Sequence, residues 1–209
     1  MNSLHRKPLT ALALKATLKN SQGGPSSTQQ LLEYVESHLA PLGVTTQHIR
    51  LSDYEIAPGV TSDEGDGDQW PEIREKIVAC DILLMGTPIW LGQPSSICKR
   101  ALERMDAFLS ETDAENHMPS YPRVAGVVVV GNEDGAHHVS AELYQALNDV
   151  GFTIPANAVS YWVGEAMQST DFKDLKVIPD TVVEATKLLA INCAHLARIL
   201  REDPYPANG

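Results

Sequence analysis

Apolar and polar residues alternate along the chain in two different patterns. Short, almost purely apolar segments have the length of buried strands, and between them apolar residues recur every three or four positions, the period of an amphipathic helix. Strands are expected at 9–16, 44–49, 81–86, 123–130 and 152–160. The segment 123–130 (RVAGVVVV) is typical of a strand buried on both faces of a parallel sheet.

Five helices are expected between and after these strands. The first begins near Thr28, behind a capping box of Ser27 and Gln30, and ends at 41–43. The others are expected at about 71–79, from Pro94 to about 109, around an apolar stripe at 139–150, and at about 179–200. This alternation predicts an α/β fold, a three-layer sandwich in which helices cover both faces of a five-stranded parallel sheet of order 2-1-3-4-5.

The remaining segments add little regular structure. The acidic stretch 52–69 lacks the glycine and glutamate positions of an EF-hand loop, and its composition favours a solvated, mobile connection. The tail 202–209 is expected to fray. With 209 residues and no linker, the chain is expected to form one domain over 1–209, with its core at about 9–200.

Composition narrows the environment and the partners. The chain carries 16 basic and 27 acidic side chains, and its net charge of −11 argues against a nucleic-acid partner. Its apolar runs are too short to span a membrane, and the first residues lack the apolar region and cleavage site of an export signal. Three scattered cysteines suit a reducing compartment, so we expect a cytoplasmic location.

The loop at 17–28 (TLKNSQGGPSST), between the first strand and the first helix, favours phosphate binding. In a sheet of this order, ligands bind beyond the carboxyl ends of strands one and three. A helix N-terminus offers unpaired N–H groups and a partial positive charge to an anion. The candidate donors are Thr17, Lys19, Ser26, Ser27 and Thr28. A purely structural role of these hydroxyls as helix caps stays open, and the loop matches neither the P-loop nor the dinucleotide fingerprint.

The loop at 86–96 (GTPIWLGQPSS), after the third strand, suits a flat aromatic ring. An isoalloxazine needs apolar walls, backbone polar groups at its edge, and a glycine where the main chain passes close to it. The candidate contacts are Pro88, Ile89, Trp90, Leu91 and Gly92. A hydrophobic turn packed under a neighbouring element is the structural alternative.

The loop at 131–138 (GNEDGAHH), after the fourth strand, lies in the right position for the opposite side of the ring. The candidate contacts are Gly131, Asn132, Glu133, Asp134, Gly135 and His138. No metal site is expected, because the adjacent His137 and His138 point in different directions on a helix and no H-E-x-x-H spacing exists. A surface histidine in a first helical turn remains the alternative for either of them.

Together these loops resemble those of the NAD(P)H-dependent FMN reductases and related flavodoxin-fold flavoproteins, over about 9–200. The most specific likeness is the family's T-P-I-[YW]-x-G segment, matched by TPIWLG at 87–92. The resemblance implies a flavodoxin-like fold and non-covalent FMN, with its phosphate in the first loop and its ring between the second and third. The family's G-S-x-R-x-x-S start is replaced here by Ala16, Thr17, Leu18 and Lys19 with a longer loop. No compact cysteine cluster occurs, so FMN is expected to be the only redox centre.

The function expected from the resemblance is hydride transfer from NAD(P)H through FMN to a small acceptor such as a quinone or a flavin, in a homodimer or homotetramer. No catalytic side chain is expected, because the cofactor performs the chemistry. The alternative is a flavodoxin-type one-electron carrier or an FMN-binding module without NAD(P)H turnover. A serine hydrolase is disfavoured, since no G-x-S-x-G elbow occurs. An insertion at 162–172, with Trp162, Met167 and Phe172, is expected to cap the ring or to cross a subunit boundary.

Overall fold

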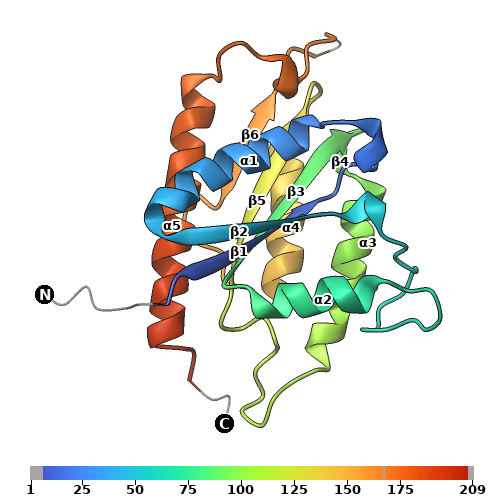
Figure 1. The fold of residues 1–209 in the computed structure, drawn as a ribbon, viewed down its shortest axis with the longest axis vertical. Coiled ribbons are helices and arrows are strands. Elements are labelled where there is room, and N and C mark those ends of the chain that lie inside the picture. Colours follow the sequence, from blue (N-terminus) through green and yellow to red (C-terminus); the bar gives the residue numbers. More distant parts are fainter. Residues whose placement is uncertain (1–6, 167, 207–209) are drawn as a thin grey trace, which may run out of the picture.

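A parallel sheet with helices on both faces forms the centre of the protein (Figure 1). The structure is a computed structural model that describes residues 7–166 and 168–206. Its parallel strands are β1 (Leu9–Lys15), β2 (Val44–Arg50), β3 (Ile82–Trp90), β5 (Val124–Gly131) and β6 (Val159–Val163). They lie in the order β2-β1-β3-β5-β6, which confirms the predicted order 2-1-3-4-5. A two-residue strand, β4 (Gln93–Pro94), pairs antiparallel with the end of β3.

Within the described residues, five helices form the two outer layers. They are α1 (Ser27–Leu39), α2 (Trp70–Ala79), α3 (Ser96–Met105), α4 (Ala136–Asp149) and α5 (Asp180–Glu202). Short 3₁₀ turns are η1 (Ser21–Gly23), η2 (Ala40–Leu42), η3 (Leu51–Asp53), η4 (Asp106–Leu109) and η5 (Phe172–Asp174). Helices α1 and α5 pack on one face of the sheet, and α2, α3 and α4 pack on the other.

The strand sequences explain this arrangement. In β1 the alternate residues Ala11 and Ala13 belong to the core under α1 and α5, whereas Leu12 and Leu14 belong to the core on the opposite face. Strand β5 is buried over its first seven residues, as its uninterrupted apolar sequence predicts. Both faces of the sheet are therefore covered by apolar helix faces.

The fifth parallel strand differs from its prediction. We expect a strand at 152–160, but β6 spans Val159–Val163, and the preceding segment makes only a single bridge, between Thr153 and Val124. Pro155 has no N–H to donate to a ladder, and Asn157 adopts a positive φ of 54°, so pairing begins only after them. Trp162 consequently lies inside β6 rather than in an insertion.

The third strand is longer than predicted. Strand β3 continues through the expected turn at 87–92 as far as Trp90, and the chain then reverses at Leu91 and Gly92. Both residues have positive φ, 53° and 74°, the conformation that two-residue hairpin turns require. This hairpin lies at the carboxyl ends of the strands, where ligands are expected.

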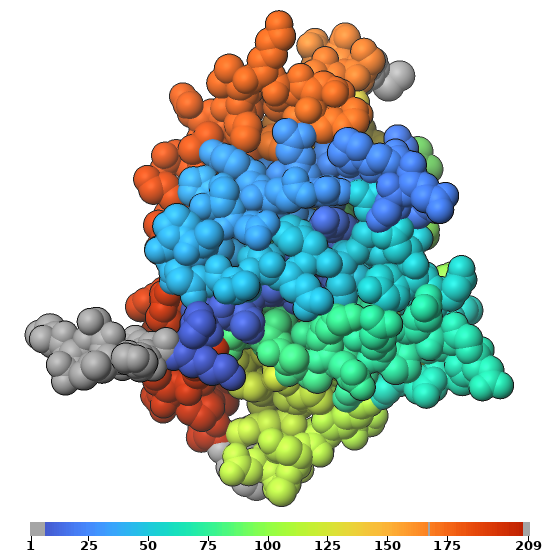
Figure 2. Space-filling model, in the orientation of Figure 1, coloured from blue at the N-terminus to red at the C-terminus, as the bar shows by residue number. Residues whose placement is uncertain are grey.

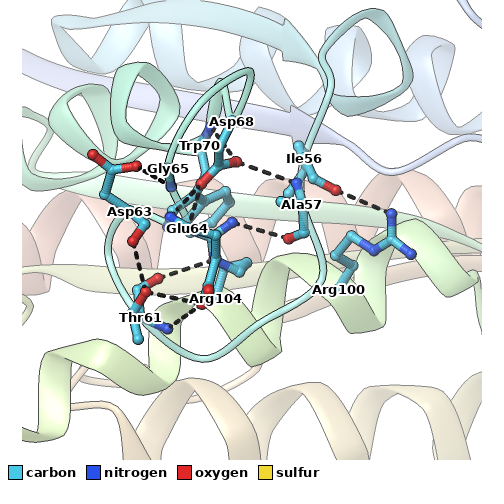
Figure 3. A network of polar contacts seen from close by, with 10 residues as sticks. All are labelled: Ile56, Ala57, Thr61, Asp63, Glu64, Gly65, Asp68, Trp70, Arg100 and Arg104. Carbon is cyan, nitrogen blue, oxygen red and sulfur yellow. Dashed lines mark hydrogen bonds and ion pairs between the residues drawn. The ribbon is translucent and has the colours of Figure 1, made fainter.

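The acidic stretch 52–69 is not the mobile connection that its composition predicts, because it is tied to α3 (Figure 3). The guanidinium of Arg104 donates to the carbonyls of Thr61 and Ala57 (both 2.9 Å) and to the carboxylate of Asp68 (2.7 Å). Both charged side chains are fully buried. Burial alone would raise the pKa of Asp68, but hydrogen bonds from Arg104 and from the backbone of Glu64, Trp70 and Ala57 hold it far below its usual range.

The chain end is also more ordered than predicted where the structure describes it. After α5, the Tyr205 hydroxyl lies 2.7 Å from that of Thr153, and the ring of His117 donates to the Pro206 carbonyl at 2.8 Å. Residues 207–209, the last three of the expected frayed tail, lie outside the described residues. The same is true of Met167 and of residues 1–6, which belong to the segment searched for an export signal. Within the described ranges, no helix is long and apolar enough to cross a membrane.

The three cysteines are buried in the two cores. Cys80 and Cys98 lie in the core under α2, α3 and α4, and Cys193 lies in the core under α1 and α5. Burial raises the pKa of each thiol to about 12. At neutral pH all three are therefore uncharged apolar side chains.

Candidate functional site

A cleft of about 660 Å³ opens at the carboxyl ends of the strands, and all three predicted loops line it. Eleven of the candidate residues meet there, although they come from segments more than a hundred residues apart: Thr17, Lys19, Ser26, Ser27, Thr28, Pro88, Ile89, Trp90, Gly131, Asn132 and Glu133. The volume lies within the range of sites that bury a small organic ligand.

The polar end of the cleft is formed by the first loop and the start of α1. The Ser26 hydroxyl accepts from the N–H of Gln29 (3.1 Å) and its carbonyl from that of Gln30 (3.1 Å). Ser26 is therefore the N-cap of α1. For this residue, the alternative of a purely structural role as a helix cap is correct. Among the described residues, the N–H groups of Ser27 and Thr28 have no such partner, so they remain available to an anion.

Two residues that the sequence analysis missed hold this loop in place from the end of β2. The guanidinium of Arg50 donates to the carbonyls of Asn20 (2.7 Å) and Gly24 (3.0 Å), and more weakly to that of Lys19 (3.3 Å). Asp53 accepts from the backbone N–H and the hydroxyl of Ser21, and this hydroxyl lowers the pKa of Asp53. The sequence indicates only that Arg50 ends the strand after the first loop and helix. It does not indicate which groups this side chain contacts.

The apolar end is formed by the β3–β4 hairpin and the end of β5. Ile89 is buried against Gly131, where a Cβ atom would lie 2.9 Å from that of Ile89, so this glycine allows the two strand ends to meet. Trp90 is 55% exposed. It is not packed under a neighbouring element, which removes the structural alternative for this residue.

Glu133 links the hairpin to the third loop. Its carboxylate accepts from the N–H groups of Leu91 (3.0 Å) and Gly92 (3.3 Å), the two residues of the turn. Leu91 and Gly92 themselves do not line the cleft. Because Glu133 already occupies their amides, this arrangement does not offer these two donors to a ligand.

Three further candidates in the third loop also lie outside the cleft. Asp134 is exposed, and Gly135 (φ 129°) lies so close to the hairpin that a Cβ atom would be 2.9 Å from the Cα of Gly92. His138 turns toward its own helix, with Nε2 2.9 Å from Glu142 Oε1 and 2.9 Å from Gln93 Nε2. His137 instead contacts the Tyr161 hydroxyl at 3.1 Å. No group of three potential metal ligands occurs in the described part of the chain.

A fourth segment, which the three-loop hypothesis does not include, completes the cleft. Between β6 and α5 the chain folds back over the start of α1, seen as the orange surface along the blue helix in Figure 2. Trp162, Gln168 and Asp171 line the cleft and belong to the segment 162–172, which the sequence analysis expects to cap the ring or to cross a subunit boundary. Lining residues that it did not single out are Leu18, Pro25, Val130 and Lys173. Phe172 is buried behind Trp162, with ring centroids 5.7 Å apart, so it supports this wall without lining it.

These residues fit the parts of FMN. Hydroxyls, spare N–H groups and lysines at the start of α1 suit a phosphate monoester. Pro88, Ile89 and Trp90, on the β3–β4 hairpin, suit an aromatic ring, and Trp162 adds a further aromatic surface to the same cleft. The donor set and its separation into a polar and an apolar end thus agree with a phosphorylated tricyclic ligand.

The fold and the cleft together define a flavodoxin-like flavoprotein. The family model of NADPH-dependent FMN reductases matches residues 13–168, and the chain belongs to this family. It is therefore an oxidoreductase of the flavoenzyme class, and the family supports FMN and NAD(P)H as its cofactors.

Comparisons with known sequences and structures put this membership in context. The chain is 34% identical over 209 residues to 8-demethyl-8-aminoriboflavin-5'-phosphate synthase of Streptomyces davaonensis, a match that covers 94% of this chain and 80% of the relative. It is similar to the crystal structure of RosB with bound 8-demethyl-8-formylriboflavin-5'-phosphate, with a TM-score of 0.84, 32% identity, and coverage of 94% and 82%. The apo form of the NADH:FMN oxidoreductase EMOB (TM-score 0.64, 18% identity, coverage 91% and 89%) shares the fold.

Proposed function

We propose that the cleft binds FMN without a covalent link and that the enzyme transfers hydride from NAD(P)H to a small acceptor such as a quinone or a flavin. The observation that carries this proposal is the meeting of three distant loops in one cleft, with phosphate-type donors at one end and apolar walls at the other. Bound FMN would supply the hydride chemistry, so no acid or base among the side chains is required.

The residues of the cleft divide into two proposed roles. Thr17, Lys19, Ser27 and Thr28 bind the phosphate, and Ser26 orders the first turn of α1. The proposed ring contacts are Pro88, Ile89, Trp90, Gly131, Asn132 and Glu133. Of the candidates outside the cleft, Leu91, Gly92, Gly135 and His138 shape the hairpin at its apolar end.

The half-exposed Trp90 suggests how a second substrate reaches the ring. Its side chain lies at the mouth of the cleft, where an aromatic surface can stack against a nicotinamide or an acceptor. We therefore assign both substrates to the same open side and expect them to bind in turn.

The test is an anaerobic titration of the purified, flavin-loaded protein with NADH and with NADPH. The expected result is a yellow protein whose flavin absorbance is bleached by at least one nicotinamide and restored by a quinone. A colourless protein that takes up no added FMN would refute flavin binding. Bound flavin that neither nicotinamide bleaches would instead support the one-electron carrier or the binding module.

A second function is favoured by the 34% identity to the synthase, whose name describes a modified flavin phosphate as product. In this case the bound flavin would be the substrate, altered at its position 8, and not a recycled cofactor. Mass spectrometry of the flavin released after incubation separates the two functions. A mass equal to that of FMN supports the reductase, and a mass change at the 8-substituent supports flavin modification.

The remaining expectations belong to the same proposal. We propose one domain over 1–209, assembled as a homodimer or homotetramer in the cytoplasm. Light scattering coupled to size exclusion measures the assembly directly, and a mass equal to that of one chain would contradict it.

A further inference from the structure

The polar end of the cleft contains one cation that no loop of the predicted pattern supplies. Lys173 lies in η5, in the segment between β6 and α5, and lines the cleft together with Asp171. This position lies beyond the span that the family model matches, which ends at residue 168. Lys173 therefore lies outside the part of the chain that contains the three family loops.

Lys173 is attached to the start of α1 by its backbone. Its N–H donates to the Ser27 hydroxyl at 3.3 Å, across 146 positions of sequence. Its ammonium lies between the carboxylates of Asp171 (2.8 Å) and Asp174 (2.9 Å). These hydrogen bonds raise the pKa of Lys173, so the group is a full cation at neutral pH.

The charge balance of the cleft gives this cation a role. A phosphate monoester carries about −1.5 to −2 charges at neutral pH. The first loop contributes only one cation, Lys19, and it lacks the arginine of the family's usual sequence. Lys173 is a second cation that lines the same cleft, on a backbone bonded to Ser27 at the start of α1, and it would supply the missing charge.

We propose that Lys173 binds the phosphate group of the flavin, and that Asp171 and Asp174 hold its ammonium beside the cleft when no phosphate is present. The inference rests on the proposed function, because it assumes that FMN binds in this cleft. It adds the segment between β6 and α5 to the first loop as an element that distinguishes a phosphorylated flavin from riboflavin. The negative charge of Asp171 repels the phosphate of FMN, whereas riboflavin has no phosphate and is not repelled.

The test compares Lys173→Met with the wild-type protein for two probes, FMN and riboflavin, by quenching of flavin fluorescence. Methionine keeps the apolar stem of the side chain and removes the charge. FMN affinity is expected to fall about tenfold or more, the effect of a lost charge-assisted hydrogen bond, while riboflavin affinity stays unchanged. An unchanged ratio of the two affinities, whether both fall or neither does, would overturn the proposal.

Three further variants sharpen the result. Lys173→Arg should retain most of the preference for FMN, and Asp171→Asn should raise FMN affinity several-fold without affecting riboflavin. Lys176→Met, at an exposed lysine of the same segment, is the matched control and should behave as wild type. Lower FMN affinity in Asp171→Asn would count against the proposal. If the wild-type protein binds neither flavin, the proposed function itself fails, and this outcome is distinct from a preserved preference in Lys173→Met.

Discussion

Two polar loops follow neighbouring strands, and each is held by one arginine, yet they differ in what they leave unpaired. The loop after β1 is held by Arg50, and the acidic loop after β2 is held by Arg104. In the acidic loop the arginine meets a carboxylate, Asp68, and both are fully buried. In the first loop the arginine meets carbonyls, and the N–H groups of Ser27 and Thr28 remain available within the part of the chain described.

This difference separates a structural loop from a binding loop. Both carboxylate oxygens of Asp68 are occupied by the protein itself, so this group is not available to a ligand. The first loop is equally well positioned but keeps donors directed at a cleft. Variants of the two arginines should therefore have different consequences, on folding in one case and on ligand binding in the other.

The largest effect is expected from Arg104→Ala, which leaves Asp68 as an uncompensated buried charge. The free energy of unfolding should fall by about 3–5 kcal/mol, measured by urea denaturation. Arg100→Ala is the matched control, because Arg100 lies one turn earlier on α3 and donates to a single carbonyl, that of Ile56 (3.0 Å). It should cost about 1 kcal/mol. Equal losses in the two variants would contradict the special role of the buried pair.

Asp68→Asn is expected to cost about 3 kcal/mol at pH 7, with a defined pH dependence. The pKa of Asp68 is lowered in the folded protein, so its stabilising contribution is complete above the unfolded pKa of about 3.9 and is lost as the pH falls toward the folded value. The difference in unfolding free energy between wild type and variant should be equal at pH 7 and pH 5, and smaller at pH 3. A difference that already shrinks between pH 7 and pH 5 would contradict the lowered pKa of Asp68. Asp66→Asn, at an exposed position of the same loop, is the control.

Arg50→Met should release the first loop while leaving the acidic loop intact. Because three backbone carbonyls lose their donor, we expect a stability loss of about 1–3 kcal/mol and an FMN dissociation constant raised about tenfold. Isothermal titration with FMN measures the second effect. FMN binding that is unchanged in Arg50→Met would show that the loop holds its shape without this residue.

The smallest effect is expected from Ser21→Ala, which removes the hydroxyl bonded to Asp53 at an exposed site. The backbone N–H of Ser21 still donates to the same carboxylate (2.7 Å), so the unfolding free energy should change by less than about 1 kcal/mol. The pKa of Asp53, followed by NMR titration, should rise toward its ordinary value, because the lost hydroxyl is the main cause of its lowering. No change in that titration would place the cause elsewhere.

The sequence predicts those parts of the molecule that depend on local pattern. The apolar run of β5 and the order of the parallel strands follow from periodicity and from the geometry of crossovers. The predicted capping box of Ser27 and Gln30 was wrong by one residue, because Ser26 is the N-cap and accepts from the N–H of Gln29. The prediction of a strand at 152–160 was wrong. The segment is largely apolar, but Pro155 and the positive φ of Asn157 prevent its backbone from pairing as a strand. Apolar content and pairing ability are separate properties, and only the first is visible as a pattern.

The candidate site divides in the same way. The three loops could be identified because each directly follows a predicted strand, and eleven of their residues line the cleft. Arg50, Arg104 and Lys173 could not be assigned, since the partner of a long charged side chain depends on which element packs beside it. The sequence also could not show that Glu133 binds the amides of Leu91 and Gly92, because that contact joins two loops some forty positions apart.

The burial of Cys80, Cys98 and Cys193 makes them sensitive to the opening of the whole molecule. A thiol with a pKa of about 12 that no reagent can reach does not react with an alkylating agent, so in the native protein iodoacetamide should leave all three sulfur atoms unmodified. They lie on both faces of the sheet, and the rate at which each becomes alkylated would time the separation of the two cores during unfolding.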